Sequence, residues 1–390
     1  MKAALDGIVV LDASQLIAGP LAALYLADLG ADVIKIEPPE GDKGRILGPV
    51  PVDEGRTTTF IAVNRNKRSV VLDLKTPVGQ ASLQMLLRRA DVVITSARVD
   101  SAKRLGLSPG AIRNANRNII TCAITGFGET GPLSKEPALD YAVQARSGIM
   151  AISGHEEQPI RLAVTVIDIS SAHIATQGIL AALFHRERTG EGQHIDVALY
   201  DAALSLQVTP FSAYLRTGKQ PPRTGNATLL GAPADLFATR DGFIVVNAYF
   251  PEQWLSLCSI LQRRDLLEDV RFKDNDSRLR HRKELFTILS ETFAKRTTED
   301  WTRILSSGDI VASPICTYAD VEKSEQTAVN EMIVEWSDPH AGPMRGLGYP
   351  LKMSQTPPQQ RRSAPQLGEH TDEVLREFGA DPARLPQEVR

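Results

Sequence analysis

The sequence predicts an α/β protein built on a doubly wound parallel sheet. Between residues 7 and 199, short apolar runs alternate with segments of helical periodicity. The run at 8–11 is continuous rather than alternating, which is typical of a strand that is buried on both faces of a sheet. Strands joined by helical crossovers are normally parallel, with right-handed connections. Together these observations favour an open parallel sheet with helices on both faces.

The first strand–helix–strand unit spans residues 7–37. Residues 8–11 form an apolar run, and Gly19-Pro20 then opens a helix that ends at Gly30, because proline is tolerated in a first helical turn. The same pattern predicts further strands at 33–36, 69–74, 91–95, 119–125 and 195–199. It predicts helices at 21–29, 75–89, 109–115, 141–147 and 201–207.

Changes in composition divide the chain into four segments. Residues 1–210 are expected to form the N-terminal part of a large domain, and 211–228 a linker with dense glycine and proline. Residues 229–321 are expected to be a small α+β domain, because a hairpin signal at Arg240-Asp241-Gly242 precedes helical patterns. Those helical patterns lie at 251–261, 280–293 and 298–306. The C-terminal segment, 322–390, carries a proline-rich stretch and a short helix at 371–378.

Composition favours a soluble cytoplasmic enzyme. The net charge of −3 offers no electrostatic footprint for nucleic acid or for a membrane surface. The longest apolar segment, near 174–184, is too short to span a bilayer, and no signal peptide is expected. No cluster of histidine, cysteine and carboxylate residues predicts a metal site. The three cysteines, Cys122, Cys258 and Cys316, lie far apart and are expected to be buried thiols.

Residues 126–131 match the dinucleotide-binding pattern GxGxxG directly after a predicted strand. The fingerprint requires a helix to open at the third glycine. Here Pro132 follows, and the next residues are polar or proline, so no apolar helix begins. We therefore interpret this segment as a glycine-rich loop rather than a dinucleotide site.

The stretch 161–188 contains the most informative carboxylate. Asp168 follows an apolar run at 162–167, expected to be a strand, and precedes a helix with Gly178 in its middle, where another backbone is expected to pack closely. Aspartate is a favoured N-cap residue. A partly desolvated carboxylate at a helix N-terminus is also a workable nucleophile, with N–H dipoles nearby for an oxyanion. The local pattern alone favours the cap and leaves the nucleophile open as the alternative.

Many segments, in this order, resemble the class III CoA-transferases, a family that includes carnitine CoA-transferases and 2-methylacyl-CoA racemases. The matching segments are LDGIVVLD (5–12), IAGP (17–20), LADLGADVIKIEPPEGD (26–42), NRNKRSVVLDLK (64–75), RLGL (104–107), ITGFGETGP (124–132), LDYAVQARSGIM (139–150), GILAALFHRERTGEGQHIDVAL (178–199) and LGEHTDEVL (367–375). The resemblance implies a Rossmann-like large domain with its parallel sheet built from both chain ends, and an interlocked homodimer. It also implies transfer of CoA from an acyl-CoA to a free carboxylic acid.

By this resemblance Asp168 aligns with the catalytic carboxylate, which forms anhydride and aspartyl-CoA thioester intermediates. Asp140 aligns with a second acidic position of the active site, although the residues alone favour a turn or cap before its own helix. Leu139 stands where the racemases carry a histidine. Because leucine cannot transfer a proton, racemisation is disfavoured.

For CoA, which is expected as a substrate and not as a tightly bound cofactor, the resemblance points to four residues: Ala18, Leu72, Lys75 and Arg104. Arg45 and Arg98 are further candidates for its phosphates. The alternative is that such cations are solvated surface residues. Formyl-CoA transferases carry a glutamine where this chain has Ile17 and a glycine-rich lid that 225–241 lacks, so oxalate and formate are not expected.

Other functions remain open on the sequence alone. The nearest is an isomerase of the same family, either a racemase or an intramolecular CoA mover. A more distant one is an NAD-dependent oxidoreductase. A third is a CoA-binding protein without turnover, for which Asp168 would be dispensable.

Overall fold

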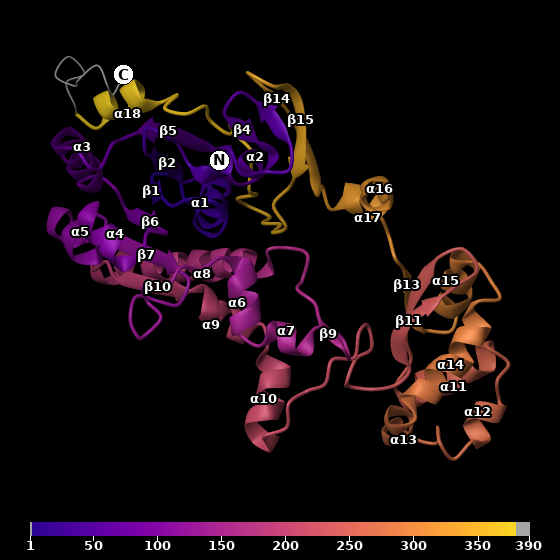
Figure 1. Cartoon of the computed structure of the whole chain (residues 1–390). Coiled ribbons are helices and arrows are strands. Elements are labelled where there is room, and N and C mark those ends of the chain that lie inside the picture. Colours follow the sequence, from indigo (N-terminus) through magenta and orange to yellow (C-terminus); the bar gives the residue numbers. More distant parts are fainter. Residues whose placement is uncertain (1, 380–390) are drawn as a thin grey trace. The chain divides into compact units, whose positions relative to one another are not determined.

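The computed structural model describes residues 2–379, and the chain separates into two compact units (Figure 1). The first contains Met1–Ile149, Leu162–Lys219 and Ala328–Arg390, and the second contains Met150–Arg161 and Gln220–Thr327. These boundaries differ from the sequence expectation, since the second unit runs over Gln220–Thr327 instead of 229–321. The segment Met150–Arg161 clusters with the second unit, and the first half of the expected linker is occupied by helix α10 (Val208–Thr217).

The first unit is built on a six-stranded sheet in the order β10-β7-β6-β1-β2-β5, with every neighbouring pair parallel. The strands are β1 (Val9–Ala13), β2 (Asp32–Glu37), β5 (Lys67–Val71), β6 (Val92–Thr95), β7 (Ile120–Thr125) and β10 (His194–Ala198). Numbered along the chain, this is the order 3-2-1-4-5-6 read from the other edge. The predicted doubly wound parallel sheet is confirmed. The order in which successive strands are added to the sheet reverses between β1 and β6. In sheets of this type, ligands commonly bind at such a reversal, beyond the carboxyl ends of the strands.

Alternating side chains of the strands fill two separate cores. In β1, Val10 belongs to one buried cluster, with Ala22 of α1 (Ala18–Asp28) and Ile179 of α8 (Val166–Thr189). The next residue, Leu11, belongs to the other, with Leu83 of α3 (Pro77–Leu87). Because successive strand side chains point to opposite faces, a continuous apolar run is what a sheet covered on both sides requires.

The returning C-terminal segment adds a helix and a hairpin but no strand to this sheet. Helix α18 (Thr371–Glu377) packs beside β5 (Figure 1). Strands β14 (Ile333–Asp338) and β15 (Gly342–Leu347) form their own antiparallel pair. The expectation that both chain ends build the parallel sheet is therefore wrong, since all six strands lie within residues 9–198. Arg68 of β5 forms ion pairs with Glu373 and Glu377 of α18, which attach this helix to the edge of the sheet.

Shorter elements complete the first unit. Its helices include α2 (Thr58–Asn64), α4 (Val99–Arg104), α5 (Pro109–Ala115), α6 (Asp140–Arg146) and α9 (Leu199–Ser205), with a 3-10 turn at Lys43–Arg45 and a small hairpin of β3 (Pro51–Asp53) and β4 (Arg56–Thr57). No helix opens after Gly131, in agreement with the rejected dinucleotide fingerprint. A Cβ at Gly126 would lie 2.1 Å from the Cβ of Ala138, so this glycine is needed for close packing.

Helix α8 is longer than its apolar centre suggested. It has 24 residues and a mean hydropathy of 1.3 in its most apolar window, so by length and composition it is able to cross a membrane. Its side chains Ala172, Ala175, Ile179 and Ala182, however, are fully buried in the core of the first unit. We interpret α8 as a core helix. The close neighbour of Gly178 is a side chain rather than a backbone, because Ile195 Cγ2 lies 3.2 Å from where its Cβ would be.

The second unit has a three-stranded antiparallel sheet, β11-β12-β13, covered by helices. The hairpin predicted around residues 240–242 is confirmed, with β11 (Ala234–Ala238) paired to β12 (Phe243–Asn247) and β12 to β13 (Val311–Pro314). The other elements are β8 (Gly154–His155), β9 (Gln158–Pro159), α7 (Ile149–Ile152, at the unit boundary), α11 (Pro251–Ile260), α12 (Asp265–Glu268), α13 (Asn275–Arg280), α14 (Arg282–Phe293), α15 (Thr298–Ser306), α16 (Tyr318–Lys323) and α17 (Glu325–Val329). Cys258 is buried here, but Cys316 is exposed, against expectation, because it lies in the short irregular segment between β13 and α16.

Candidate active site

Asp168 lies in the first turn of α8, inside the helix and not at its cap. The N-cap position belongs to Thr165, whose side chain makes no capping hydrogen bond. The preceding residues 162–165 form no strand, and Leu162 and Val164 are exposed. Both local expectations for this stretch, a buried strand and an aspartate cap, are therefore wrong. The helix begins at Val166, three residues earlier than an N-cap at Asp168 would place its start.

The cap of α8 is supplied by Asp140, the first residue of α6. One of its carboxylate oxygens, Oδ2, accepts the backbone N–H of Ile167 at 2.8 Å and that of Asp168 at 3.2 Å. These are the amides that an N-cap side chain normally satisfies. Asp140 was expected to cap its own helix, α6, but it caps α8 instead. The same hydrogen bonds place its carboxylate beside the backbone of Asp168.

The first-turn amides of α8 are all occupied. Besides the two bonds to Asp140, Val166 N–H donates to the carbonyl of Val164 at 2.8 Å, and Ile169 N–H to that of Thr165 at 3.1 Å. An oxyanion cannot bind these N–H groups without displacing an acceptor. The expectation that this helix N-terminus offers free donors for an oxyanion is therefore not supported by the hydrogen-bond pattern.

The environment of Asp168 makes its carboxyl group unusually basic. Burial, followed by the negative charge of nearby Asp140, raises its pKa from the ordinary value of 3.8 to about 7. Removal from water disfavours the carboxylate, and a second carboxylate nearby disfavours it further. The side chain remains partly exposed, so a substrate can reach it. A basic, accessible carboxylate is suited to nucleophilic attack.

Apolar side chains are exposed on the segments that carry the two carboxylates. Leu139, which directly precedes Asp140, is 63% exposed, and Tyr141 follows it on the surface. Ile169, next to Asp168, is also exposed. Leu139 offers no proton donor or acceptor, so no acid–base partner stands at this position.

A second feature of the first unit is a cavity of about 340 Å³ at the carboxyl ends of β1, β2, β5 and β6. Its lining includes Leu72, Lys75 and Arg98, three of the residues selected from sequence, and also Lys43, which sequence reasoning missed. Lys43, Lys75 and Arg98 are all exposed cations. The cavity lies where the topology of a doubly wound sheet places ligands.

A buried charge cluster stands next to this cavity. Asp12 Oδ2 accepts a hydrogen bond from Lys67 Nζ at 2.8 Å, and Lys35 Nζ lies 2.7 Å from Asp42 Oδ2. Burial alone would raise the pKa of Asp12, but the ammonium groups of Lys67 and Lys35 lower it to about 2. Two carboxylates and two ammonium groups thus balance each other inside the fold.

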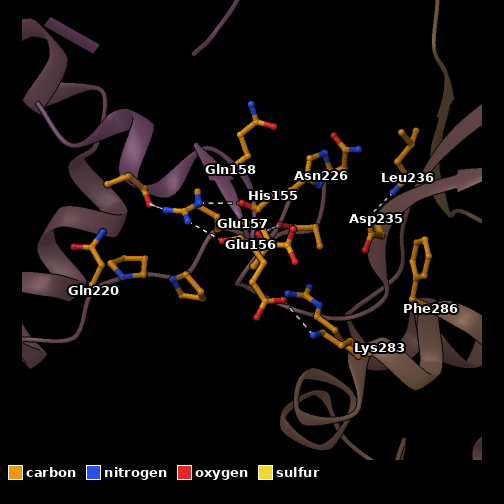
Figure 2. A pocket seen from close by; sticks show the side chains of 18 of the residues that line it. His155, Glu156, Glu157, Gln158, Gln220, Asn226, Asp235, Leu236, Lys283 and Phe286 are labelled. Carbon is orange, nitrogen blue, oxygen red and sulfur yellow. Dashed lines mark hydrogen bonds and ion pairs between the residues drawn. The ribbon is translucent and has the colours of Figure 1, made fainter. Parts of the chain in front are cut away.

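The second unit contains an open cavity of about 1070 Å³ (Figure 2). Its polar side chains are largely bonded to their surroundings. Arg223 donates to the backbone carbonyls of His155 at 2.9 Å and Glu156 at 2.7 Å, and Lys283 lies 3.3 Å from the Glu156 carboxylate. None of the residues selected from sequence lines this cavity.

Comparison with known proteins settles the family. The model of CoA-transferase family III matches residues 5–371, which is most of the chain. The chain belongs to this family. The resemblance found in the separate sequence segments is thereby confirmed.

Relatives of this CoA-transferase match it over most of their length. A succinate–glutarate CoA-transferase of Agrobacterium fabrum is 38% identical over 384 residues, which cover 97% of this chain and 96% of that protein. A succinyl-CoA:glutarate CoA-transferase of Mus musculus is 34% identical, over 96% of this chain and 86% of that protein. The crystal structure of a CAIB/BAIF family protein from Brucella suis superposes with a TM-score of 0.87 at 33% identity, covering 97% of this chain and 100% of that one. The chain is accordingly an enzyme that transfers CoA between acyl groups.

Of the residues predicted to bind CoA in this CoA-transferase, Arg45 is placed wrongly for that role. It is buried, and all of its N–H groups are used: Nε and Nη2 donate to Glu37 at 2.8 and 2.7 Å, and the guanidinium also donates to the carbonyls of Gly55 and Pro365. It also stacks on Phe60. Its low exposure and full set of partners make Arg45 a structural residue.

Ala18 and Arg104 do not line the cavity. Ala18 is buried at the start of α1. Arg104 is exposed and donates to Ser101 Oγ at 3.0 Å, and Ser101 itself lines the cavity. The structure therefore brings Leu72, Lys75 and Arg98 together and leaves Arg104 one contact away.

Proposed function

We propose that this CoA-transferase works through covalent intermediates on Asp168. The observation that carries the proposal is the partly exposed carboxylate on α8, whose pKa is raised to about 7 by burial and by Asp140. Such a group is a stronger nucleophile than an ordinary carboxylate and is still ionised in a useful fraction near neutral pH.

The reaction has two halves, one for the acyl donor and one for the acceptor acid, and each half consists of two successive acyl transfers. The Asp168 carboxylate attacks the thioester carbonyl, and the C–S bond breaks to give a mixed anhydride and CoA thiolate. The thiolate attacks the aspartyl carbonyl and releases the donor's carboxylate, which leaves an aspartyl-CoA thioester. The acceptor carboxylate then attacks the aspartyl carbonyl of this thioester, and the C–S bond breaks to give a second mixed anhydride and CoA thiolate. The thiolate attacks the acceptor's acyl carbon, and the anhydride C–O bond breaks to release the Asp168 carboxylate. Asp168 is regenerated without net proton transfer, which suits an active site without an acid–base partner at Leu139.

We place the phosphates of CoA at the cavity beside the sheet. Lys43, Lys75 and Arg98 supply cations there, and Leu72 an apolar wall. Cationic side chains form charge-assisted hydrogen bonds to phosphate oxygens. Arg45 is left out of this set, because its donors are committed to Glu37 and to backbone carbonyls.

Replacing Lys75 or Arg98 with alanine is expected to raise KM for acyl-CoA by about 5- to 20-fold, with kcat within about twofold, since a charge-assisted bond is lost equally in the ground and transition states. Lys103→Ala is the matched control, because Lys103 is exposed nearby on α4 but does not line the cavity. Steady-state kinetics with varied acyl-CoA measure the effect. If both cavity variants had the same KM for acyl-CoA as the control, the proposal that CoA binds in this cavity would be contradicted.

For the substrates, we propose small dicarboxylates, with succinyl-CoA as donor and a glutarate-like acid as acceptor. Two relatives that are 34–38% identical over nearly the whole chain carry names with succinate or succinyl-CoA and glutarate. Incubation of the enzyme with succinyl-CoA and a panel of acids, followed by chromatography of the CoA esters, tests this. Glutaryl-CoA is expected to form, and oxalyl- and formyl-CoA are not. Rapid turnover of oxalate with none of glutarate would contradict the assignment.

The pKa of Asp168 predicts how activity depends on pH. Because the nucleophile must be ionised, kcat/KM is expected to fall as pH drops through about 7, with one proton taken up. A profile from pH 5 to 9 with a stable acyl-CoA checks this. Activity that is constant down to pH 5 would show that the attacking group has an ordinary carboxyl pKa.

We further propose that the enzyme is a homodimer with interlocked subunits. Helix α10 supports this, because none of its residues is buried and it exposes Val208, Phe211, Tyr214 and Leu215. An apolar face of this kind normally marks an interface. Sedimentation is expected to give twice the chain mass of 42.5 kDa. Tagged and untagged dimers are expected not to exchange subunits without unfolding; a monomer, or free exchange, would contradict the proposal.

A further inference from the structure

The side chain of Gln144 forms hydrogen bonds both to the carboxylate of Asp140 and to the backbone of Leu162, which lies just before α8. It lies on α6 one turn after Asp140 and is completely buried, with 0% exposure. Its Nε2 donates to Asp140 Oδ1 at 2.6 Å, and its Oε1 accepts the backbone N–H of Leu162 at 2.9 Å. Nε2 also lies 3.4 Å from the carbonyl oxygen of Leu162, to which it donates.

The side-chain amide of Gln144 uses both its donors and its acceptor in these hydrogen bonds. A primary amide has two N–H donors and one carbonyl acceptor. Here one N–H serves the carboxylate, the other the carbonyl of Leu162, and the oxygen serves the N–H of Leu162. Neither glutamate nor an apolar side chain of the same length can make this set of bonds.

These contacts clamp the segment 162–168 at both ends. Gln144 binds Leu162 at its start, and Asp140, itself held by Gln144, binds the amides of Ile167 and Asp168 at its end. The segment belongs to no strand and its first residues are exposed, so it has no sheet ladder to fix it. Asp168 itself lies in the first turn of α8, so these contacts fix the chain that leads into this turn and hold the Asp140 carboxylate beside the backbone of Asp168.

Resting on the proposed function, we propose that Gln144 is a positioning residue for Asp168. It touches no reacting atom, and it acts by orienting Asp140 and the backbone before α8. A displacement of a reacting group by about 1 Å costs on the order of 100-fold in rate. CoA binding at the strand ends is independent of Gln144, which does not line that cavity.

Gln144→Met tests the clamp with a side chain of similar length. Its kcat is expected to fall by about 10- to 100-fold, with KM for acyl-CoA within about twofold. The matched control is Gln207→Met. Gln207 is also buried and donates two hydrogen bonds, to the carbonyls of Ser147 and Ala203, but it contacts neither carboxylate. Equal losses of kcat in the two folded variants would reduce Gln144 to a structural residue and overturn the proposal.

Gln144→Glu adds a second readout, the pH dependence of the rate, which reports whether the side chain at position 144 lies close enough to the two carboxylates to act on Asp168. A second negative charge near Asp168 is expected to raise its pKa further, so that the acid limb of the pH–rate profile shifts upward from about 7. An unchanged limb in a folded variant would overturn the proposal, and this measurement decides the matter if Gln144→Met does not fold. Trapping of the adduct on Asp168 separates the two proposals. No adduct in the unmodified enzyme would contradict the covalent mechanism, whereas an equal rate of adduct formation in Gln144→Met would contradict the clamp alone.

Discussion

Replacing Asp168 with asparagine is expected to lower kcat by at least about 10⁴-fold, the order of loss seen when a covalent nucleophile is removed. Asparagine has the same shape and leaves the backbone contacts to Asp140 in place. The loss is therefore expected in kcat and not in the affinity for acyl-CoA. Single-turnover kinetics together with binding of a non-reactive CoA thioester measure the two effects separately.

The same variant is expected to be more stable than the parent enzyme above pH 7. The pKa of Asp168 is raised in the folded chain, so the stabilisation from its protonated form is present below about pH 4 and is lost as pH rises through about 7. Asparagine carries no charge to bury at any pH. Thermal unfolding at pH 8 tests this prediction. A retained kcat, whatever the stability, would leave Asp168 without a catalytic role.

Replacing Asp12 with alanine is expected to destabilise the fold by about 3–5 kcal/mol, because it leaves buried ammonium groups short of a counter-charge. Lys67 loses its carboxylate partner and keeps only the neutral oxygens of Pro20 and Asn64, whereas Lys35 keeps the carboxylate of Asp42 and the carbonyl of Ser14. Three of these side chains, Asp12, Lys35 and Lys67, are completely buried. Urea unfolding of the enzyme measures the change in the free energy of unfolding.

The double variant Asp12→Ala/Lys67→Met controls for the loss of packing. Removing the charged partner together with Asp12 is expected to recover much of the stability, since a buried ion pair replaced by apolar groups is often neutral. If Asp12→Ala alone cost less than about 1 kcal/mol, comparable to a surface change, the cluster would not be an important part of the core.

Most of the parallel sheet was predictable because its signal is local. Residues 8–11, 91–95 and 119–125 are rich in apolar side chains, and they correspond to the largely buried strands β1, β6 and β7. The hairpin β14–β15 was not predicted, because Ile333–Asp338 carries charged residues and is only partly buried. The role of the C-terminal segment was misjudged because its attachment depends on tertiary contacts, namely ion pairs of Arg68 with residues about 300 positions away.

The site was predictable where it depended on residue type, and unpredictable where it depended on tertiary contacts. Asp168 and Asp140 were both selected, but local pattern made each a cap of its own helix. Only the fold shows that Asp140 caps α8 and that Gln144 holds it there. Arg45 was selected for its charge, and its burial against Glu37 leaves no trace in the sequence. Lys43 could have been found from its place after β2, near the carboxyl end of a parallel strand.

Trapping of the covalent intermediate tests the central claim most directly. The enzyme is mixed with succinyl-CoA, and the aspartyl thioester is captured with hydroxylamine or reduced with borohydride before peptide mass spectrometry. The modification is expected on Asp168, only in the presence of acyl-CoA, and not in Asp168→Asn. Turnover of the same acyl-CoA with Asp168 never modified, or with the modification on another residue, would contradict the proposed mechanism.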